Sequence, residues 1–483
     1  MTRLSASHWT GYNRDQSCGV VHLGTGAFHR AHQAVYFDRL MAAGHPDWMI
    51  QGASLRSSRV SKQLNPQAGL YTVVTRAGGG EDSRLIGAIK HVIVAADDAE
   101  ALIDAIAAPE VALITLTVTE KGYRPALANG RLMMDDPDVQ HDLENPDHPT
   151  TALGFIAAGL AQRHANGAGP LTILSCDNMP DNGHAARRGV LAYAQARDPE
   201  LAQWIETSCT FPSSMVDRIV PATTDADIDA LGTRRGYLDR GMVKTEPFSQ
   251  WVVEDNFAAC RPPLETVDVT MTEDVAGWET AKLRLLNGAH SALAYLGLLA
   301  GHRFVHEAIT APGFADYIDA LWDEVEATLA PLQGFDASQY RAALIERFRN
   351  ASLAHQTYQI AMDGSQKLPQ RFLATIQERQ AQGLRSPALT LAVAAWMRWQ
   401  TGVGEDGAAY VVDDPMADTT RRILENADKD PSAIVDGLMG LHAIFNTDLA
   451  SDAAFKSAVT AALTQLLAGG AAKSVAEFGQ NKL

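Results

Sequence analysis

A chain of 483 residues is longer than one hydrophobic core usually serves, so we expect two domains. Its formal net charge of −17 argues against nucleic acid or an anionic membrane as a partner, although a local basic pocket can still bind an anionic substrate. The four cysteines are far apart without a CxxC pair, and no apolar run resembles a signal peptide or approaches the roughly 18 residues of a membrane span. These features predict a cytoplasmic protein with reduced thiols and no zinc site.

A strand, a glycine turn and a helix follow one another near the start of the chain. Residues 20–23 are a short β-branched run, Gly24 and Gly26 follow it, and the sequence after them reads as one helix. This context is typical of a dinucleotide site, where the backbone of the turn approaches the pyrophosphate. The motif is incomplete, because His29 replaces the third glycine of GxGxxG. We expect helix-surface or packing roles for His29 and His32, since no carboxylate or cysteine at ligand spacing accompanies them.

A second predicted strand, residues 48–55, runs into the sequence Arg56-Ser57-Ser58-Arg59. An NAD site usually has an Asp or Glu near this point, which binds the ribose hydroxyls of the adenosine. Two interpretations stay open. The segment is an ordinary polar loop, or it belongs to a cofactor site with relaxed NAD selectivity that tolerates the 2′-phosphate of NADP.

Apolar strands then alternate with helices. The predicted strands are residues 70–75, 91–95, 111–118 and 171–175, and the predicted helices are residues 99–108 and 150–165. This alternation predicts a parallel sheet covered on both faces, which is a Rossmann-like, doubly wound α/β domain. The polar segment 135–149 is expected to be an exposed loop. Asn178 follows the last strand, where an amide can reach a cofactor or substrate oxygen, but Asn is also a common turn residue.

Helical periodicity takes over after about residue 270. We therefore predict a dinucleotide-binding domain over residues 1–270 and a mostly helical substrate-binding domain over residues 271–483. A glycine-containing turn, residues 363–371, carries Lys367 and Arg371. This turn is either a helix connection with surface charges or a segment that binds an anionic or hydroxylated group of a substrate.

The apolar helix predicted over residues 278–301 carries Lys282, Asn287 and His290. At about 100° per residue, the three fit within one face of roughly 140°. They form either a solvated stripe or a catalytic trio, because polar groups are costly to bury unless they are paired. The sequence lacks HExxH, GxxxxGK[ST], GxSxG and YxxxK motifs. If the protein transfers hydride, the group that moves the proton is therefore expected on this helix.

Long motifs run in one order through nearly the whole chain: HLGTGAFHRAHQAVY, SCDNMPDNGH, FPSSMVDRIVP, EPFSQWVVEDNF, KLRLLNGAHSALAYLG and AMDGSQKLPQR. They resemble the polyol-specific long-chain dehydrogenases, the family of mannitol 2-dehydrogenase and fructuronate reductase. Within that family, EKGY and QIAMDGSQKLPQR look more like fructuronate reductase. Gln359 stands where mannitol dehydrogenases have a substrate-binding arginine.

The resemblance implies a role for each matching residue. Lys282 is implied to be the general base, and Glu279 to pass protons between the lysine and solvent. The residues implied to hold the reacting oxygen are Asn287, His290 and Asn178. Those implied to bind substrate are Asp217, Gln359, Lys367 and Arg371. Those implied to bind the cofactor are Gly24, Gly26, Ala27, Phe28, Arg56, Thr117 and Asn178.

The resemblance also implies an NAD-dependent oxidoreductase that needs no metal. Its expected reaction interconverts a secondary alcohol of a sugar acid or polyol and its ketose, with D-mannonate and D-fructuronate as the expected pair. The alternatives are mannitol 2-dehydrogenase or a related alditol dehydrogenase, and a nucleotide-binding relative without turnover. The Ser58-Arg59 sequence leaves use of NADP open. The expected oligomeric state is a monomer or a dimer.

Overall fold

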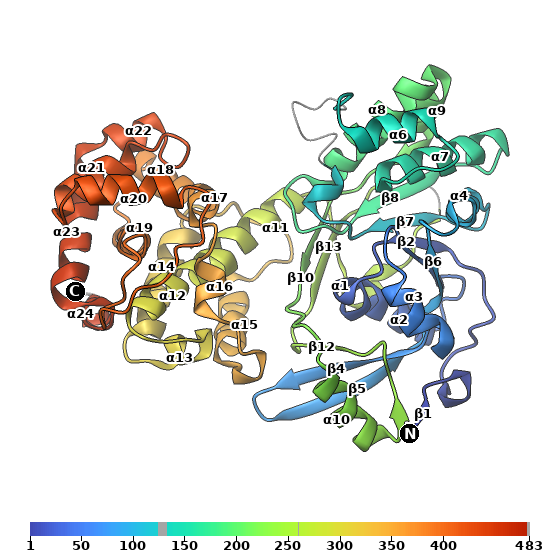
Figure 1. Cartoon of the computed structure of the whole chain (residues 1–483), viewed down its shortest axis with the longest axis horizontal. Coiled ribbons are helices and arrows are strands. Elements are labelled where there is room, and N and C mark those ends of the chain that lie inside the picture. The colour runs from blue at the N-terminus through green and yellow to red at the C-terminus, as the bar shows by residue number, and fades with distance from the viewer. Residues whose placement is uncertain (124–132, 259, 481–483) are drawn as a thin grey trace. The chain divides into compact units, whose positions relative to one another are not determined.

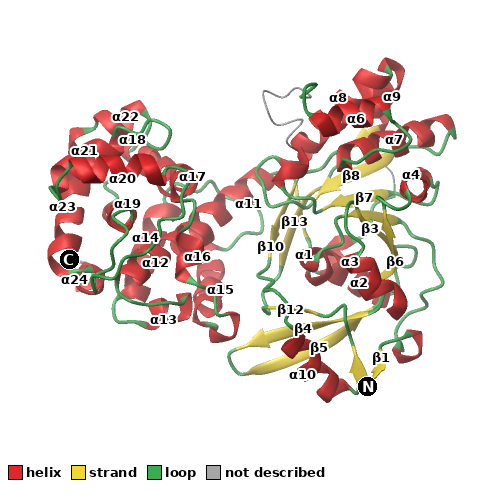
Figure 2. Cartoon of the chain, in the orientation of Figure 1, coloured by secondary structure: helices red, strands yellow, loops and turns green. Residues whose placement is uncertain are grey.

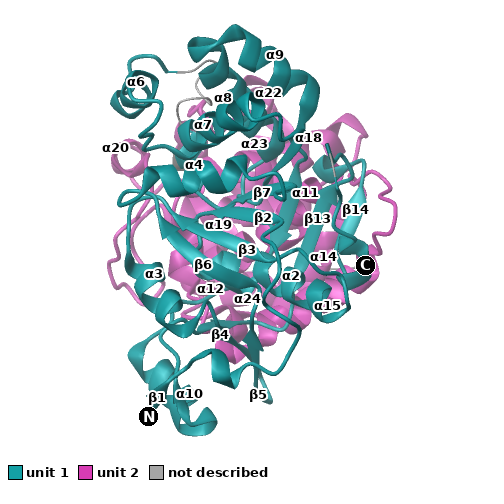
Figure 3. Cartoon of the chain, turned by 90° about the vertical axis from the view of Figure 1, so that its right-hand side faces the viewer, with its two compact units in different colours: residues 1–276 teal, residues 277–483 magenta. Residues whose placement is uncertain are grey.

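The computed structural model describes residues 1–123, 133–258 and 260–480. The chain divides into two compact units, unit 1 over Met1–Ala276 and unit 2 over Gly277–Leu483, which Figure 3 colours separately. Unit 1 contains the sheets, and unit 2 is built from helices (Figure 2). The predicted fold class, a Rossmann-like α/β domain followed by a helical domain, is confirmed.

Unit 1 is centred on a six-stranded sheet with the order β6-β3-β2-β7-β8-β9, in which each paired strand is parallel to its neighbour. Its strands are β2 (Val20–Leu23), β3 (Ile50–Ser54), β6 (Ile89–Val94), β7 (Leu113–Leu116), β8 (Leu171–Ser175) and β9 (Cys209–Thr210). The order reverses at β2, as in a doubly wound sheet, where ligands bind beyond the carboxyl ends of the strands. The residues that follow β2, β3, β7 and β8 therefore share the edge of the sheet that is suited to a ligand.

Helices cover both faces of this sheet (Figure 1). One face packs against α4 (Ala99–Ala107), α7 (Ala152–Ala165), α8 (Asn182–Arg197) and α9 (Pro199–Ser208), and the other packs against α2 (Gln33–Ala42). Successive residues of a strand point to opposite faces. Val21 accordingly belongs to the first core and Val20 to the second. Burial on both faces explains why these strands read as continuous apolar runs.

The described part of unit 1 also contains three smaller sheets. Their strands are β1 (Thr2–Arg3) with β11 (Tyr237–Leu238); β4 (Tyr71–Ala77) with β5 (Gly80–Ile86) and β12 (Val243–Thr245); and β10 (Ser214–Asp217) with β13 (Gln250–Glu254) and β14 (Thr270–Thr272). The run predicted at residues 70–75 forms β4, but it does not join the parallel sheet as expected. Gly78 and Gly79 connect β4 to β5, and a two-glycine connection favours an antiparallel hairpin. The helices α3 (Arg59–Leu64) and α10 (Asp225–Arg235) also belong to this unit.

The polar segment predicted to be an exposed loop contains a helix, α6 (Pro137–Glu144), so that prediction is wrong. Asp136 caps the helix by accepting hydrogen bonds from two backbone N–H groups of its first turn, and Pro137 occupies the first helical position, which favours proline. Val139 and Asp142 are its buried side chains. Two inward positions are too few to produce an apolar periodicity, so the sequence reads as polar throughout.

Asp142 ties α6 to the start of α7. One carboxylate oxygen accepts the N–H and O–H of Thr150, at 2.7 and 2.9 Å, and the other accepts the N–H and O–H of Thr151, at 3.0 and 2.6 Å. We expect Asp142→Ala to lower the free energy of unfolding by about 3 kcal/mol, because four part-buried donors lose their buried acceptor. Urea denaturation of the full chain measures this loss. Asp147→Ala, at an exposed position in the same segment, is the control and should change stability by less than about 0.5 kcal/mol.

The helix predicted after the glycine turn is in fact two helices, α1 (Ala27–Ala31) and α2, which meet at His32. His32 has φ −122° and ψ −93°, outside the helical region. Its Nε2 lies 2.9 Å from the carbonyl oxygen of Gln250 in β13, a contact that holds the ring inside unit 1. His29 and His32 are both fully buried, so the packing role is confirmed for them and a helix-surface position is wrong.

Unit 2 is organised around α12 (Gly288–Leu299), whose side chains are buried on every side. A helix that is apolar all round requires neighbours all round. The other helices are α11 (Val275–Ala281), α13 (Val305–Thr310), α14 (Phe314–Glu326), α15 (Ala337–Arg349), α16 (Thr357–Ala361), α17 (Gly364–Leu368), α18 (Ala374–Ala381), α19 (Pro387–Trp399), α20 (Ala417–Asn426), α21 (Pro431–Met439), α22 (Thr447–Ser451), α23 (Ala453–Gly469) and α24 (Ala471–Gln480). Among the described residues, no helix has the length and apolar character needed to cross a membrane.

Candidate active site

The glycine turn after β2 is closed by the end of β7. Gly24 has φ +97°, and a Cβ atom there would lie 2.2 Å from the carbonyl oxygen of Thr117, so only glycine fits. The hydroxyl of Thr117 donates to the carbonyl oxygen of Gly24 at 2.8 Å. The structure therefore brings Thr117, a predicted cofactor residue, directly against the turn.

Gly26 is a glycine for a different reason. Its φ of −81° and ψ of −171° are open to any residue, and a Cβ atom there would meet only the carbonyl oxygen of Gly24, at 3.7 Å. Among the described residues of unit 1, no packing contact requires glycine at this position. A ligand that approaches the backbone closely would require it, so the residues present fit a dinucleotide. Ala27 and Phe28 open α1 beside it, Ala27 exposed and Phe28 half-buried with its ring stacked on His32.

His29 fills the position of the missing third glycine by stacking on His22, with ring centroids 3.3 Å apart. The two nitrogens of His22 contact the hydroxyls of Thr115 and Thr117 at 2.8 and 2.9 Å. Burial lowers the pKa of His22 to about 3, and burial together with the neighbouring His22 lowers the pKa of His29 well below its ordinary value. Two neutral, stacked imidazole rings thus pack beside the glycine turn. His22 was not singled out from the sequence, where its only signal is a histidine inside an apolar strand.

Asn178 follows β8 at the same edge of the sheet and is exposed. The preceding residue, Asp177, is buried and accepts hydrogen bonds from the backbone N–H of Thr119 and the hydroxyl of Tyr123, at 2.7 and 2.8 Å. Burial raises the pKa of the Asp177 carboxyl. Asp177 therefore fixes the chain after β8 to the chain after β7, which positions Asn178. Sequence reasoning singled out the amide and missed the carboxylate that supports it.

Asp217 is buried at the end of β10, paired in register with Gln250 of β13. Asn182 joins β10 to the segment after β8. Its Nδ2 donates to the carbonyl oxygens of Asp177 and Ser214, at 2.9 and 2.7 Å. The predicted substrate residue Asp217 and the predicted oxyanion residue Asn178 are thus held by one hydrogen-bonded framework within unit 1.

In unit 2, the Lys282 segment is not a regular α-helix. Residues Lys282–Asn287 form a π-helical turn between α11 and α12. Such a turn closes with i→i+5 hydrogen bonds and holds more residues than an α turn, so the angular spacing expected for a regular helix does not apply. Lys282 and His290 are each 8% exposed. The interpretation of these residues as a solvated stripe is therefore wrong. π turns recur at functional sites, which agrees with a catalytic trio.

His290 is a neutral imidazole. Its ring lies 4.7 Å from that of Phe348 and 5.2 Å from that of His355. Burial, followed by the nearby His355, Arg347 and Arg371, lowers the pKa of His290 well below its ordinary value. The ring can therefore exchange hydrogen bonds with a bound oxygen but does not carry a charge at neutral pH. Asn287 is half-buried on the same segment, and Glu279 is half-buried on α11, before the π turn.

A second π-helical turn, Pro369–Leu373, packs against the first. Its Arg371 donates through Nη1 to the hydroxyl of Ser291 at 2.8 Å and to the backbone carbonyl oxygen of Asn287 at 3.3 Å. Burial lowers the pKa of Arg371 to about 10, which leaves the guanidinium charged at neutral pH. Arg371 therefore fixes the backbone of the π turn at Asn287. That Arg371 also binds substrate stays a prediction.

Lys367 lies on α17, in the segment that was expected to be a turn. Its Nζ donates to the carbonyl oxygens of Ile360 and Met362. Burial, followed by the charge of Arg371, lowers the pKa of Lys367. Gln359 lies nearby in sequence on α16 and is exposed.

Arg284, within the first π turn, was not singled out from the sequence. Its guanidinium contacts both carboxylate oxygens of Glu378 at 2.5 Å and the hydroxyl of Thr328 at 2.8 Å. A bidentate pair of this kind fixes orientation as well as contributing energy. Arg284 therefore anchors the turn that carries Lys282 to α18.

Two family models match the chain. The mannitol dehydrogenase Rossmann domain matches residues 18–266, and the mannitol dehydrogenase C-terminal domain matches residues 274–467. This chain belongs to the mannitol dehydrogenase family.

Relatives in the mannitol dehydrogenase family match this chain over nearly its whole length. The D-mannonate oxidoreductase of Escherichia coli (strain K12) is 44% identical over 95% of each chain. A mannitol 2-dehydrogenase of Aspergillus fumigatus is 38% identical over 95% of this chain and 93% of its own. The structure of Pseudomonas fluorescens mannitol 2-dehydrogenase, a ternary complex with NAD and D-mannitol, is 38% identical, with a TM-score of 0.81 over 99% of this chain and 100% of its own. The resemblance read from the motifs is therefore confirmed.

Proposed function

We propose that this protein is an NAD-dependent oxidoreductase that interconverts D-mannonate and D-fructuronate. The observation that carries the proposal is the 44% identity with D-mannonate oxidoreductase over 95% of both chains. The mannitol 2-dehydrogenase that was solved with NAD supports the cofactor, and the open space at Gly26 fits it. Mannitol 2-dehydrogenase activity is the second candidate, supported by the TM-score of 0.81.

In this proposal, unit 1 is the dinucleotide-binding domain and unit 2 the substrate-binding domain. The cofactor residues are Gly24, Gly26, Ala27, Phe28, Arg56, Thr117 and Asn178, and the substrate residues are Asp217, Gln359, Lys367 and Arg371. When bound, the nicotinamide accepts or supplies a hydride. A cytoplasmic location and a monomeric or dimeric state stay predictions.

The groups in unit 2 account for the proton and the reacting oxygen. Lys282 takes the proton of the substrate hydroxyl as general base, and Glu279 passes it on to solvent. Asn287 and neutral His290 hold the oxygen, and Asn178 adds an amide donor. A donor aimed at a developing oxyanion contributes about 3 kcal/mol to the stability of the transition state. No step in this scheme requires a metal.

The proposed substrate differs from mannitol in its carboxylate, for which Lys367 supplies a cation. We expect kcat/KM with NADH to be about 10- to 100-fold higher for D-fructuronate than for D-fructose, because a charged hydrogen bond contributes about 1.5–3 kcal/mol. Steady-state assays on both ketoses, and on D-mannonate and D-mannitol in reverse, measure the ratio. A preference for fructose and mannitol would select the second candidate. NADH binding without turnover on any of the four would indicate a nucleotide-binding relative.

A further inference from the structure

The carboxyl end of β3 carries positive charge and no acid of its own. The sequence from Leu55 to Leu64, LRSSRVSKQL, contains Arg56 and Arg59 but no Asp or Glu. This edge lies beside the glycine turn, since β3 pairs directly with β2. In a dinucleotide site an acid at this point binds the ribose 2′-hydroxyl, whereas an arginine accommodates the 2′-phosphate of NADP. The local sequence alone therefore predicts a site that tolerates the 2′-phosphate of NADP.

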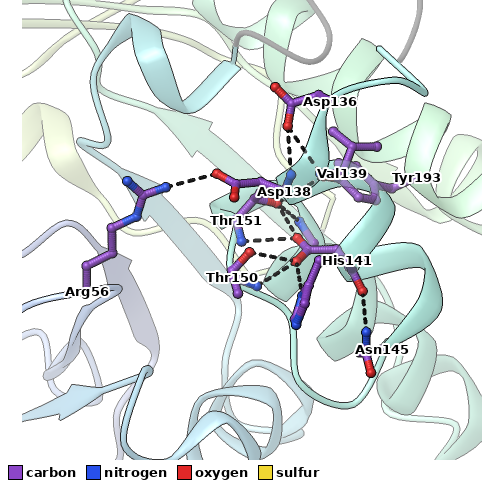
Figure 4. A network of polar contacts seen from close by, with 11 residues as sticks. Arg56, Asp136, Asp138, Val139, His141, Asn145, Thr150, Thr151 and Tyr193 are labelled. Carbon is purple, nitrogen blue, oxygen red and sulfur yellow. Dashed lines mark hydrogen bonds and ion pairs between the residues drawn. The ribbon is translucent and has the colours of Figure 1, made fainter.

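A carboxylate from a distant part of the chain alters that reading. Oδ2 of Asp138 on α6 lies 3.2 Å from Nη2 of Arg56, and Figure 4 shows the arginine extended towards it. The side chains are 56% and 78% exposed, respectively. Exposed ion pairs of this kind contribute little to folding. The pair therefore matters for the local charge at this edge of the sheet, where the carboxylate of Asp138 offsets the positive charge of Arg56.

Asp138 stands on a helix that the fold holds firmly. Its own backbone N–H donates to the capping carboxylate of Asp136 at 2.9 Å, and the next residue, Val139, is fully buried. One turn on, the Asp142 carboxylate binds the start of α7, and a Cβ atom at Gly154 would lie 2.2 Å from Asp142 Oδ2, so that glycine makes room for it. The backbone that carries Asp138 is thus fixed by packing, and its exposed carboxylate lies beside Arg56.

We propose that Asp138 is a specificity-determining residue for the cofactor: it neutralises Arg56 and repels a 2′-phosphate, so that the site selects NAD over NADP. The inference rests on the proposed function only in assuming that unit 1 binds a nicotinamide dinucleotide. Asp138 supplies, from the β7–β8 crossover, the negative charge that is missing after β3. Arg56 is then restrained by its partner and does not act as a receptor for phosphate.

The test is the dissociation constant of the full chain for NADH and for NADPH, read by fluorescence titration with no sugar present. The wild type should bind NADH at least about tenfold more tightly than NADPH. Asp138→Asn should tighten NADPH binding about tenfold and change NADH binding less than about twofold, because one repulsive charge is lost and one cation is released. Asp138→Ser should act in the same direction, which guards against an effect specific to one variant.

The double variant separates the two parts of the inference. In an Arg56→Ala background, Asp138→Asn should give a clearly smaller gain for NADPH than it gives alone. The matched control is Glu206→Gln, which removes an acid from another exposed ion pair of unit 1, with Arg187 at 2.6 Å, and should change neither constant. An unchanged NADPH constant in both Asp138 variants, or an equal gain without Arg56, would overturn the inference. Since no sugar is present, a failed substrate panel with the expected nucleotide shifts would reject the proposed substrate alone.

Discussion

Lys282→Met is expected to lower kcat for alcohol oxidation by about 10³-fold while the dissociation constant for NADH stays at its wild-type value. A positioned general base contributes about 10²- to 10⁴-fold to a proton-transfer step, and methionine matches the lysine side chain up to Cε but has no basic nitrogen. Lys282 is only 8% exposed, so an apolar side chain suits the position and the fold should be retained. Steady-state kinetics and an NADH titration of the same preparation measure the two quantities.

Leu283→Met is the matched control, because it places the same side chain at the next residue of the same π turn. It should keep kcat within about threefold of the wild type. Lys282→Ala adds a second measurement, since small primary amines in the buffer should restore part of the rate in the order of their basicity. A Lys282→Met enzyme with more than about a tenth of the wild-type kcat would remove this residue from the role of base.

The sheet of unit 1 could be predicted from the sequence for a physical reason. Strands that are buried on both faces must be apolar at every position, so β2, β7 and β8 stand out as short apolar runs between helices. The glycine turn could also be predicted from the sequence. Gly24 adopts a φ of +97°, which other residues avoid, so this position must be glycine. These local signals are enough to predict the order of strands and helices in unit 1. The family was assigned from the longer sequence motifs.

The contacts that shape the candidate site have no comparable local signal. A π turn differs from an α turn by one residue within a continuous helix, so the apolar pattern around Lys282 reads as regular. The Arg56–Asp138 pair joins residues 82 positions apart, and nothing near either residue announces the other. Helix α6 was missed because Val139 and Asp142 are its only buried residues. In a sequence, an aspartate indicates an exposed position, and nothing shows that this one is buried with hydrogen-bond donors around it. The hydrogen bonds and ion pairs that support the candidate site residues were therefore not predictable from the local sequence.

Arg371→Met is expected to lower kcat about 100-fold with little change in the dissociation constant for NADH. Loss of the guanidinium releases the carbonyl of Asn287 and the hydroxyl of Ser291, so the amide that is proposed to hold the reacting oxygen is no longer fixed. A displacement of about 1 Å at such a group costs about 10²-fold in rate. The free energy of unfolding should also fall, by about 2 kcal/mol, because a charged donor with two acceptors is removed.

The split between kcat and KM tells positioning apart from substrate binding. If Arg371 contacts the substrate and contributes equally to ground and transition states, KM rises and kcat is unchanged. If it positions Asn287, kcat falls and KM moves little. Ser291→Ala is the matched variant, since it removes the contact at 2.8 Å and leaves the one to Asn287 in place. It should cost about 1 kcal/mol of stability and keep kcat within about threefold. The two variants can also be compared by the loss of kcat per kcal/mol of lost stability. If that ratio is the same for Arg371→Met and Ser291→Ala, Arg371 supports the fold and does not set the geometry of the site.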